Sequence, residues 1–234
     1  PLGRVTVEPH AFVDVDSVGN IAGNVYPAPY WTAAQRRAFA ITGGYVALVP
    51  PGASASEAAG IGGDLVAVTA DTGCVEGVCA GSRVWAWRGG TWTAVRGLEQ
   101  AYERAVAVSS DGRILVATVD DDEQETRRAY VVRGGNLRRR RELHMVPGTE
   151  AVVRDVSAIG WVVGTGTRSG GGLEGQTEGI AWAVGRLYFL SEHLVDEDWR
   201  ITSAIAVDDE GRIVGTGVHR VTGLSGPILL TPVR

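Results

Sequence analysis

AVAVSSDGRI at residues 105–114 returns as AIAVDDEGRI at residues 204–213. In both copies an alternating run of small and branched apolar residues leads into a polar turn that ends in glycine, and a second apolar run follows. Alternation on either side of such a turn is typical of a β-hairpin. Because the same hairpin occurs twice, the chain is built from tandem repeats.

Three further copies align on the turn glycine, at intervals of roughly 44 to 51 residues. Each copy continues with a third run that is rich in aromatic or branched residues, and in four copies a fourth run follows a glycine turn. The repeat units are residues 10–50, 56–98, 104–141, 152–192 and 203–234. Four strands per repeat is the content of a propeller blade.

The fifth copy ends before a fourth run, while residues 3–7 have the form of a fourth run placed ahead of the first copy. A strand from the N-terminus that pairs into the last blade would account for both ends and would remove a free sheet edge. The sequence therefore predicts an all-β chain, residues 1–234, folded as a single domain. We expect a five-bladed β-propeller of four-stranded blades, closed by residues 3–7.

The repeat also carries a family resemblance. The pattern Ala-x-Ala-Val-x-x-x-Gly-x-Ile-Val-Gly, the aromatic third strand and the ending Ile228-Leu229-Leu230-Thr231-Pro232 resemble the HAF-type bacterial extracellular repeats, most closely at 104–137 and 203–232. The second unit departs from the pattern because Gly62-Gly63 shortens its turn, and the first has Asp14 in place of a small residue. The resemblance implies an exported, propeller-like repeat protein and supplies no catalytic motif.

Composition narrows the classes of partner. The 22 basic residues are all arginine, and the net charge of −5 argues against a general nucleic-acid binder, which must neutralise phosphates. No segment reaches the roughly 18 unbroken apolar residues of a membrane-spanning helix. There is no dinucleotide fingerprint, phosphate loop or nucleophile elbow, so no cofactor is expected. We expect a monomer.

Two cysteines, Cys74 and Cys79, lie close together between the second and third runs of the second unit. An isolated pair in a loop, with no second pair to complete a zinc site, favours a disulfide. A disulfide in turn favours an extracellular or cell-envelope protein whose signal peptide has been removed.

The long loops between the second and third runs, and between one unit and the next, would gather on one rim of a propeller. Binding residues on repetitive scaffolds usually lie on such irregular loops. Our candidate ligand-binding residues on this rim are Tyr26, Tyr30, Trp31, Arg154, Asp155 and Trp199. The aromatic side chains could stack on a sugar ring, or could simply plug the edges of the blades. Trp85, Trp87 and Trp182 fit the repeat pattern and are expected to pack between blades.

Asp14 and Asp155 stand in the innermost runs, where the other units have Gly60, Ala107 and Ala206. A carboxylate beside the propeller axis must be solvated, paired or functional. The pair could divide acid and base roles as in glycoside hydrolysis, or could merely contact water. The acidic run at 120–125 lacks the spacing of a calcium loop, and the four histidines share no zinc spacing, so no metal is expected.

Three roles remain open from the sequence. One is an exported binding module that recognises a glycan, a small molecule or a protein. The second is an enzyme, a hydrolase or a cyclase, with a central site at Asp14 and Asp155. The third is a purely structural repeat of the cell envelope. A deep axial pocket on which both carboxylates converge would favour the enzyme, whereas shallow pockets repeated between blades would favour the binding module.

Overall fold

The computed structural model describes residues 10–25, 36–73, 79–98, 102–121, 126–144, 149–168 and 176–233. Within them the chain is almost entirely β-structure, with one short 3-10 helix, η2 (Leu190–His193). The strands are β1 (His10–Val15), β2 (Ile21–Val25), β3 (Arg37–Ile41), β4 (Tyr45–Leu48), β5 (Ala55–Gly62), β6 (Leu65–Thr72), β7 (Gly81–Arg88), β8 (Thr91–Ala94), β9 (Tyr102–Val108), β10 (Ile114–Asp121), β11 (Thr126–Arg133), β12 (Asn136–Glu142), β13 (Thr149–Val156), β14 (Val162–Arg168), β15 (Thr177–Ala183), β16 (Arg186–Phe189), β17 (Trp199–Val207), β18 (Ile213–His219) and β19 (Ser225–Leu230).

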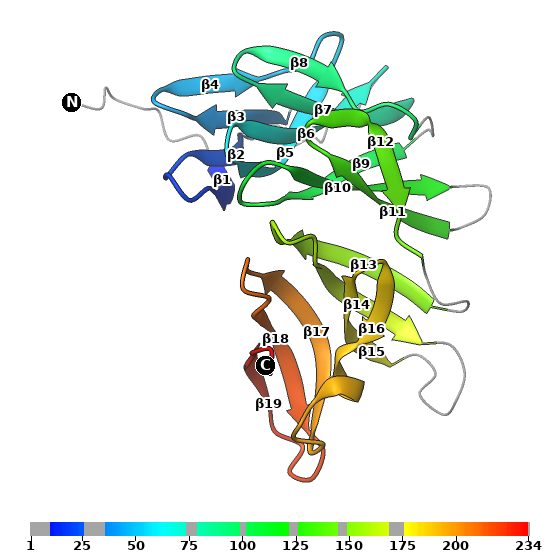
Figure 1. Cartoon of the computed structure of the whole chain (residues 1–234). Coiled ribbons are helices and arrows are strands. Elements are labelled where there is room, and N and C mark those ends of the chain that lie inside the picture. Colours follow the sequence, from blue (N-terminus) through cyan, green and yellow to red (C-terminus); the bar gives the residue numbers. More distant parts are fainter. Residues whose placement is uncertain are drawn as a thin grey trace.

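These strands form five antiparallel meanders, which we call blades 1 to 5. Blade 1 is β1–β4, blade 2 is β5–β8, blade 3 is β9–β12, blade 4 is β13–β16 and blade 5 is β17–β19. Blades 2 and 3 are joined into one eight-stranded sheet through a parallel bridge between Ser82 and Tyr102. Figure 1 shows β1–β12 gathered in one half of the molecule and β13–β19 in the other.

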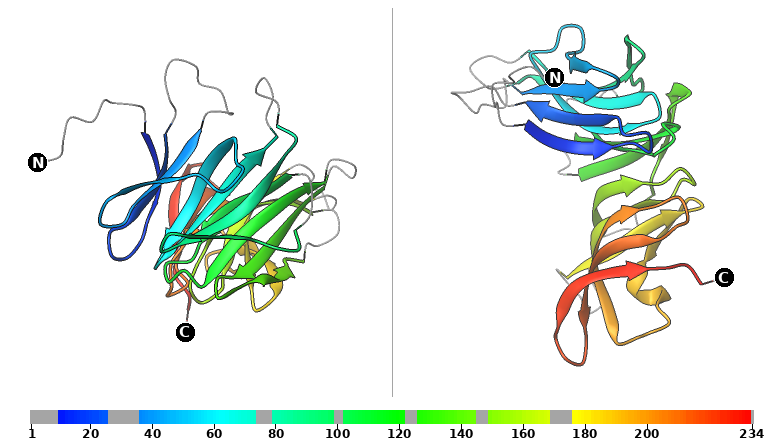
Figure 2. Two further views of the ribbon diagram at one scale, coloured as in Figure 1. Left: turned by 90° about the horizontal axis from the view of Figure 1, so that it is seen from above. Right: turned by 90° about the vertical axis from the view of Figure 1, so that its left-hand side faces the viewer.

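Successive blades pack face to face, as the two views of Figure 2 show. A separate apolar cluster fills each interface. Alanines and valines dominate between blades 1 and 2, whereas Trp182 and Phe189 join the cluster between blades 3 and 4. Further clusters lie between blades 2 and 3 and between blades 4 and 5. The alternation read from the sequence therefore places one side of each strand in one interface and the other side in the next.

The hairpin turns at the ends of the innermost strands are closed by their own polar side chains. The carboxylate of Asp16 accepts the backbone N–H groups of Val18 and Asn20, and Asp208 accepts those of Glu210 and Arg212 in the same way. The shorter turn of blade 2 instead lies against blade 3. A β-carbon built on Gly62 would stand 1.9 Å from the carbonyl oxygen of Ser109, so only glycine permits this approach.

The all-β prediction is confirmed, but the closed five-bladed propeller is wrong. None of the sheets is closed on itself, and in the described part of the chain blade 5 has three strands, so that β19 pairs only with β18. Residues 3–7, the expected closing strand, lie outside the described residues. The faces of the end blades also remain exposed: Phe12 is 69% exposed on blade 1 and Leu229 is 63% exposed on blade 5. The repeat signal correctly indicated stacked meanders, but a local repeat does not determine how many blades a complete ring needs.

Candidate functional site

Every innermost strand carries a β-bulge at the same place in the repeat. The bulged residues are Val13, Ala59, Val106, Arg154 and Ile205. A bulge re-aims the side chain that follows it. The residues that follow are the two carboxylates, Asp14 and Asp155, and the three small residues, Gly60, Ala107 and Ala206.

Both carboxylates bind the backbone of the next blade. The Oδ2 atom of Asp14 accepts the Ile61 N–H at 3.0 Å, across the interface between blades 1 and 2. The Oδ2 atom of Asp155 accepts the Val207 N–H at 2.8 Å, across the interface between blades 4 and 5. In each case Oδ1 accepts the N–H of the following residue, Val15 or Val156. Asp14 and Asp155 are therefore latches between blades.

Burial raises the pKa of Asp155 above its usual value of 3.8, although the two N–H donors oppose the shift. The negative charges of Asp14 and Asp209 raise this pKa further. Burial likewise raises the pKa of Asp14, against the hydrogen bonds from Ile61 and Val15. The structure thus brings the two predicted carboxylates into one electrostatic environment, but it occupies all four of their oxygens with backbone donors.

A second polar link joins the hairpin turns of three blades. Asp209 of blade 5 accepts the Ser110 hydroxyl of blade 3 and the Ala158 N–H of blade 4, both at 2.7 Å. The hydrogen bonds to Asp209 and to Asp155 together show that carboxylates hold this end of the molecule together, because each accepts hydrogen bonds from a neighbouring blade.

The structure separates residues that the sequence analysis placed on one rim. Trp199 opens β17 and packs edge-to-face on His219, at 5.2 Å between ring centroids. Asp155 is bound to Val207, the last residue of the same strand. Nine residues of strand span roughly 26 Å, so Trp199 and Asp155 lie at opposite ends of the blades. Arg154 is the exposed bulge residue beside Asp155, at the end away from Trp199.

The other rim candidates, Tyr26, Tyr30 and Trp31, lie outside the described residues, as does Cys74. Cys79 lies just ahead of β7. The aromatic cluster and the Cys74–Cys79 disulfide stay predictions.

The described surface is hollowed instead at the outer parts of the blade interfaces. Grooves of about 610, 750 and 600 Å³ lie between blades 2 and 3, blades 3 and 4, and blades 4 and 5. All three are of the size that small-molecule sites have. Each is bounded on one side by the third and fourth strands of one blade. The opposite wall differs: turns of blade 4 in the groove between blades 3 and 4, a turn together with β12 in the groove between blades 2 and 3, and β19 with the residues around it in the groove between blades 4 and 5.

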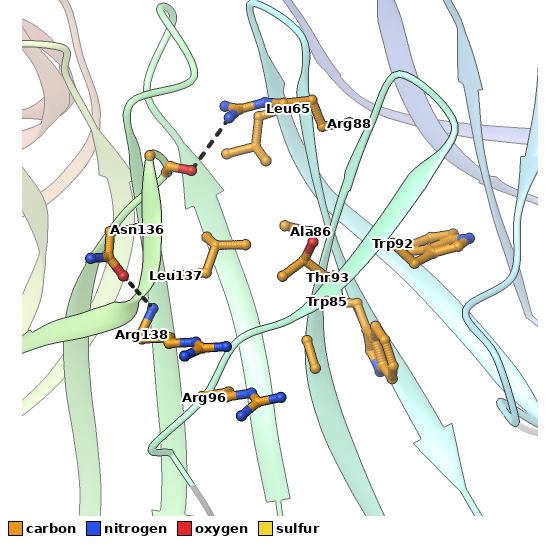
Figure 3. A pocket seen from close by; sticks show the side chains of 13 residues that line it. Leu65, Trp85, Ala86, Arg88, Trp92, Thr93, Arg96, Asn136, Leu137 and Arg138 are labelled. Atoms are coloured by element: carbon orange, nitrogen blue, oxygen red, sulfur yellow. Dashed lines mark hydrogen bonds between the residues drawn. The ribbon is translucent and has the colours of Figure 1, made fainter.

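The linings of the three grooves differ. Figure 3 shows the groove between blades 2 and 3, with Leu65, Ala86 and Thr93 facing Asn136 and Leu137, and with Arg96 and Arg138 at one end. The groove between blades 3 and 4 is lined by arginine side chains of blade 3. The groove between blades 4 and 5 is apolar, with Tyr188, Leu194 and Leu230 among its walls.

The tryptophans of the repeat pattern fall into two groups. Trp182 is fully buried in the cluster between blades 3 and 4, and its Nε1 donates to the His144 carbonyl at 3.1 Å. Trp87 is only partly buried beside the cluster between blades 1 and 2, and Trp85 packs edge-to-face on Trp92 at 6.4 Å. Only Trp182 is a core residue in the full sense that the sequence analysis expected.

Within the described ranges, no group of three or more His, Cys, Asp or Glu side chains is arranged to hold a metal ion. No helix found there is long and apolar enough to cross a bilayer.

The fold defines the chain as a β-propeller-like protein, and comparison with solved structures agrees. It is similar to a prolyl endopeptidase studied for the role of inter-domain dynamics in catalysis and specificity, with a TM-score of 0.62 and 16% identity over 98% of this chain. It is also similar to the acylaminoacyl peptidase of Pyrococcus horikoshii, with a TM-score of 0.58 and 12% identity over 90%. The chain spans 35% of the length of each of these two proteins.

A third similar structure is the β-propeller domain of the trilobed protease from Pyrococcus furiosus, which has an open Velcro topology. The TM-score is 0.57 with 12% identity, over 90% of this chain and 61% of that one. No family model and no curated protein matches the sequence. At these identities the likeness concerns the fold alone.

Sequence reasoning missed the bulges and the grooves. The sequence carries a faint signal of the bulge, because small residues flank the bulged position in the clearest repeats. We assumed a strict alternation of inward and outward side chains, and this assumption leaves no place for the extra residue. The arginine run at 138–141 is visible in the sequence, where it favours protection of a sheet edge, with an anion site as the lesser interpretation.

Proposed function

We propose that this chain is a binding module whose ligands occupy the grooves between its blades. The observation that carries the proposal is the repetition of a groove at three successive blade interfaces, each of a size suited to a small molecule or a short glycan. Because the linings differ, the three grooves are not equivalent sites for one sugar. Each groove would bind a different chemical class of ligand.

The alternative, an enzyme with a central site at Asp14 and Asp155, has one observation in its favour. Burial raises the pKa of both carboxyls, as a general acid requires. Against it, every oxygen of the pair accepts a backbone hydrogen bond, and these bonds fasten one blade to the next. A carboxylate used in this way is poorly placed to transfer a proton to a substrate.

We also propose that the protein is exported, on the strength of the cysteine pair and of the resemblance to HAF-type repeats. We further propose that this chain serves as one domain of a longer protein, as the similar β-propeller domain does in the trilobed protease.

The test is a thermal-shift and calorimetric screen of the full chain against neutral oligosaccharides, acidic oligosaccharides and small apolar compounds. Tyr188→Ala would lower the affinity for ligands of the groove between blades 4 and 5. Leu137→Ala would lower the affinity for ligands of the groove between blades 2 and 3. Asp14→Asn and Asp155→Asn would leave binding intact and lower stability. Loss of binding or turnover in a folded Asp155→Asn variant, with the groove variants unaffected, would favour the central site instead.

A further inference from the structure

Blade 3 presents a row of arginines to the groove that it forms with blade 4. Val131 pairs with Arg141 across β11 and β12, and Val131 packs on the cluster shared with blade 4. The pairing of β11 with β12 is irregular between Val132 and Arg133, so alternation does not decide which way the neighbouring arginines face. Arg133 and Arg139 nevertheless line the same groove as Arg141. All three arginines line the groove, and all three are exposed.

The arginine run divides between two grooves. Arg140 also borders the groove between blades 3 and 4, but it pairs with Val132 of the cluster between blades 2 and 3, and its guanidinium lies over the Tyr130 ring at 5.0 Å. Arg138 lines the groove between blades 2 and 3, where Figure 3 shows it. Charged residues that protect a sheet edge from aggregation need not line a groove. Arg139 and Arg141 nevertheless line the groove between blades 3 and 4.

The opposite wall leaves room for these cations. Blade 4 contributes Ala158, Ile159 and Gly160 from one turn and Val184 from another, none of which carries a charge. The Arg141 Nη1 atom comes within 3.5 Å of the place that a β-carbon on Gly185 would take, so this guanidinium reaches across to blade 4. Among the described residues, Arg133, Arg139 and Arg141 form no ion pair, whereas Arg113, at the corner of the groove, pairs with Asp111 at 3.5 Å.

The size of the groove and the charges around it limit the ligand. A volume of about 750 Å³ suits a small molecule. A long polyanion would run on to the hairpin turns, where Asp111 and Asp209 lie, and would be repelled there. Guanidinium groups bind carboxylate, sulfate and phosphate oxygens in bidentate fashion.

We propose that the groove between blades 3 and 4 binds a small ligand with two or more acidic groups, held by Arg133, Arg139 and Arg141. The inference rests on the proposed function, because it names the ligand class of one of the grooves. The shared chemistry is a pair of anionic groups, which an acidic oligosaccharide or a phosphorylated small molecule could supply.

Isothermal titration calorimetry of the full chain would use three probes: trigalacturonate for carboxylates, a heparin-derived tetrasaccharide for sulfates and inositol hexakisphosphate for phosphates. We expect at least one probe to bind, and added salt to weaken it because exposed charges are screened. The double variant Arg139→Ser, Arg141→Ser should lose affinity by about a hundredfold. The probe that binds best distinguishes the two sources of ligand.

Arg138→Ser is the matched control, since it removes the same charge from the same strand but from the neighbouring groove. Its affinity for the probe should stay within about twofold of the wild type. Thermal melting would verify that the variants fold. Binding by none of the probes, or an equal loss in Arg138→Ser, would overturn the inference. In the first case, binding of neutral ligands in the other grooves would still support the proposed function.

Discussion

The Oδ2 atom of Asp155 accepts the backbone N–H of Val207 at 2.8 Å, so a side chain of blade 4 is bound to the main chain of blade 5. Asp14 makes the same contact from blade 1 to Ile61 of blade 2. The repeat thus uses the position that follows the bulge for two purposes: three copies hold a small residue there, and two hold a carboxylate that ties adjacent blades together.

Replacing Asp155 should destabilise the fold. Asp155→Ala removes the acceptor for the Val207 and Val156 N–H groups, which should cost about 1–3 kcal/mol in the free energy of unfolding. Urea denaturation, monitored by tryptophan fluorescence, measures this. Glu197→Ala, at an exposed position, is the control and should change the free energy by less than about 0.5 kcal/mol. Equal stability of Asp155→Ala and the wild type would show that the latch contributes nothing.

The same carboxyls should make stability depend on pH. Their pKa values are raised in the folded chain, so between 3.8 and the higher folded values the native state binds more protons than the unfolded state. The contribution of these groups is therefore fully present at low pH and is lost as pH rises through the folded pKa. The free energy of unfolding of the wild type, relative to the Asp14→Asn, Asp155→Asn variant, should fall as pH increases from about 3.8. A difference that rises over this range would mean that the shifts have the opposite sign.

Truncation of Trp182 should cost far more than truncation of Trp87. Trp182 is fully buried and donates a hydrogen bond to His144, so Trp182→Ala should lose about 3–5 kcal/mol. Trp87 is partly exposed, and Trp87→Ala should lose less than half as much. Denaturation midpoints of the two variants make the comparison. Similar losses would contradict the difference in burial.

A strained turn offers a stabilising substitution. Val184 has φ +51° and is followed by Gly185 at +79°, the left-handed pair of a type I′ hairpin turn. A β-branched residue adopts this conformation at a cost, whereas asparagine tolerates it. Because the side chain is 93% exposed, Val184→Asn should raise the free energy of unfolding by about 0.5–1 kcal/mol. A lower melting temperature in differential scanning calorimetry would count against strain at this turn.

The sequence was sufficient to predict the meanders, because alternation and glycine turns are local signals. It could not predict the open arrangement, because closure depends on how the first and last blades meet. The residues of a single repeat carry no information about that contact. The functional site was harder to predict from the sequence than the fold. Asp14 and Asp155 were recognised as exceptions in the pattern, but an unrecognised bulge determines what they contact. Trp199 and Asp155 were grouped because both are irregular, although a whole strand separates them.

The most direct test of ligand binding between the blades is hydrogen–deuterium exchange on the full chain, with and without the acidic probe that binds best. The account predicts slower exchange in the segments 113–114, 131–133, 139–141 and 158–161, which border the groove between blades 3 and 4. It also predicts no change at residues 199–202, at the other end of the blades. Protection at 199–202 with unchanged exchange along the groove would contradict it.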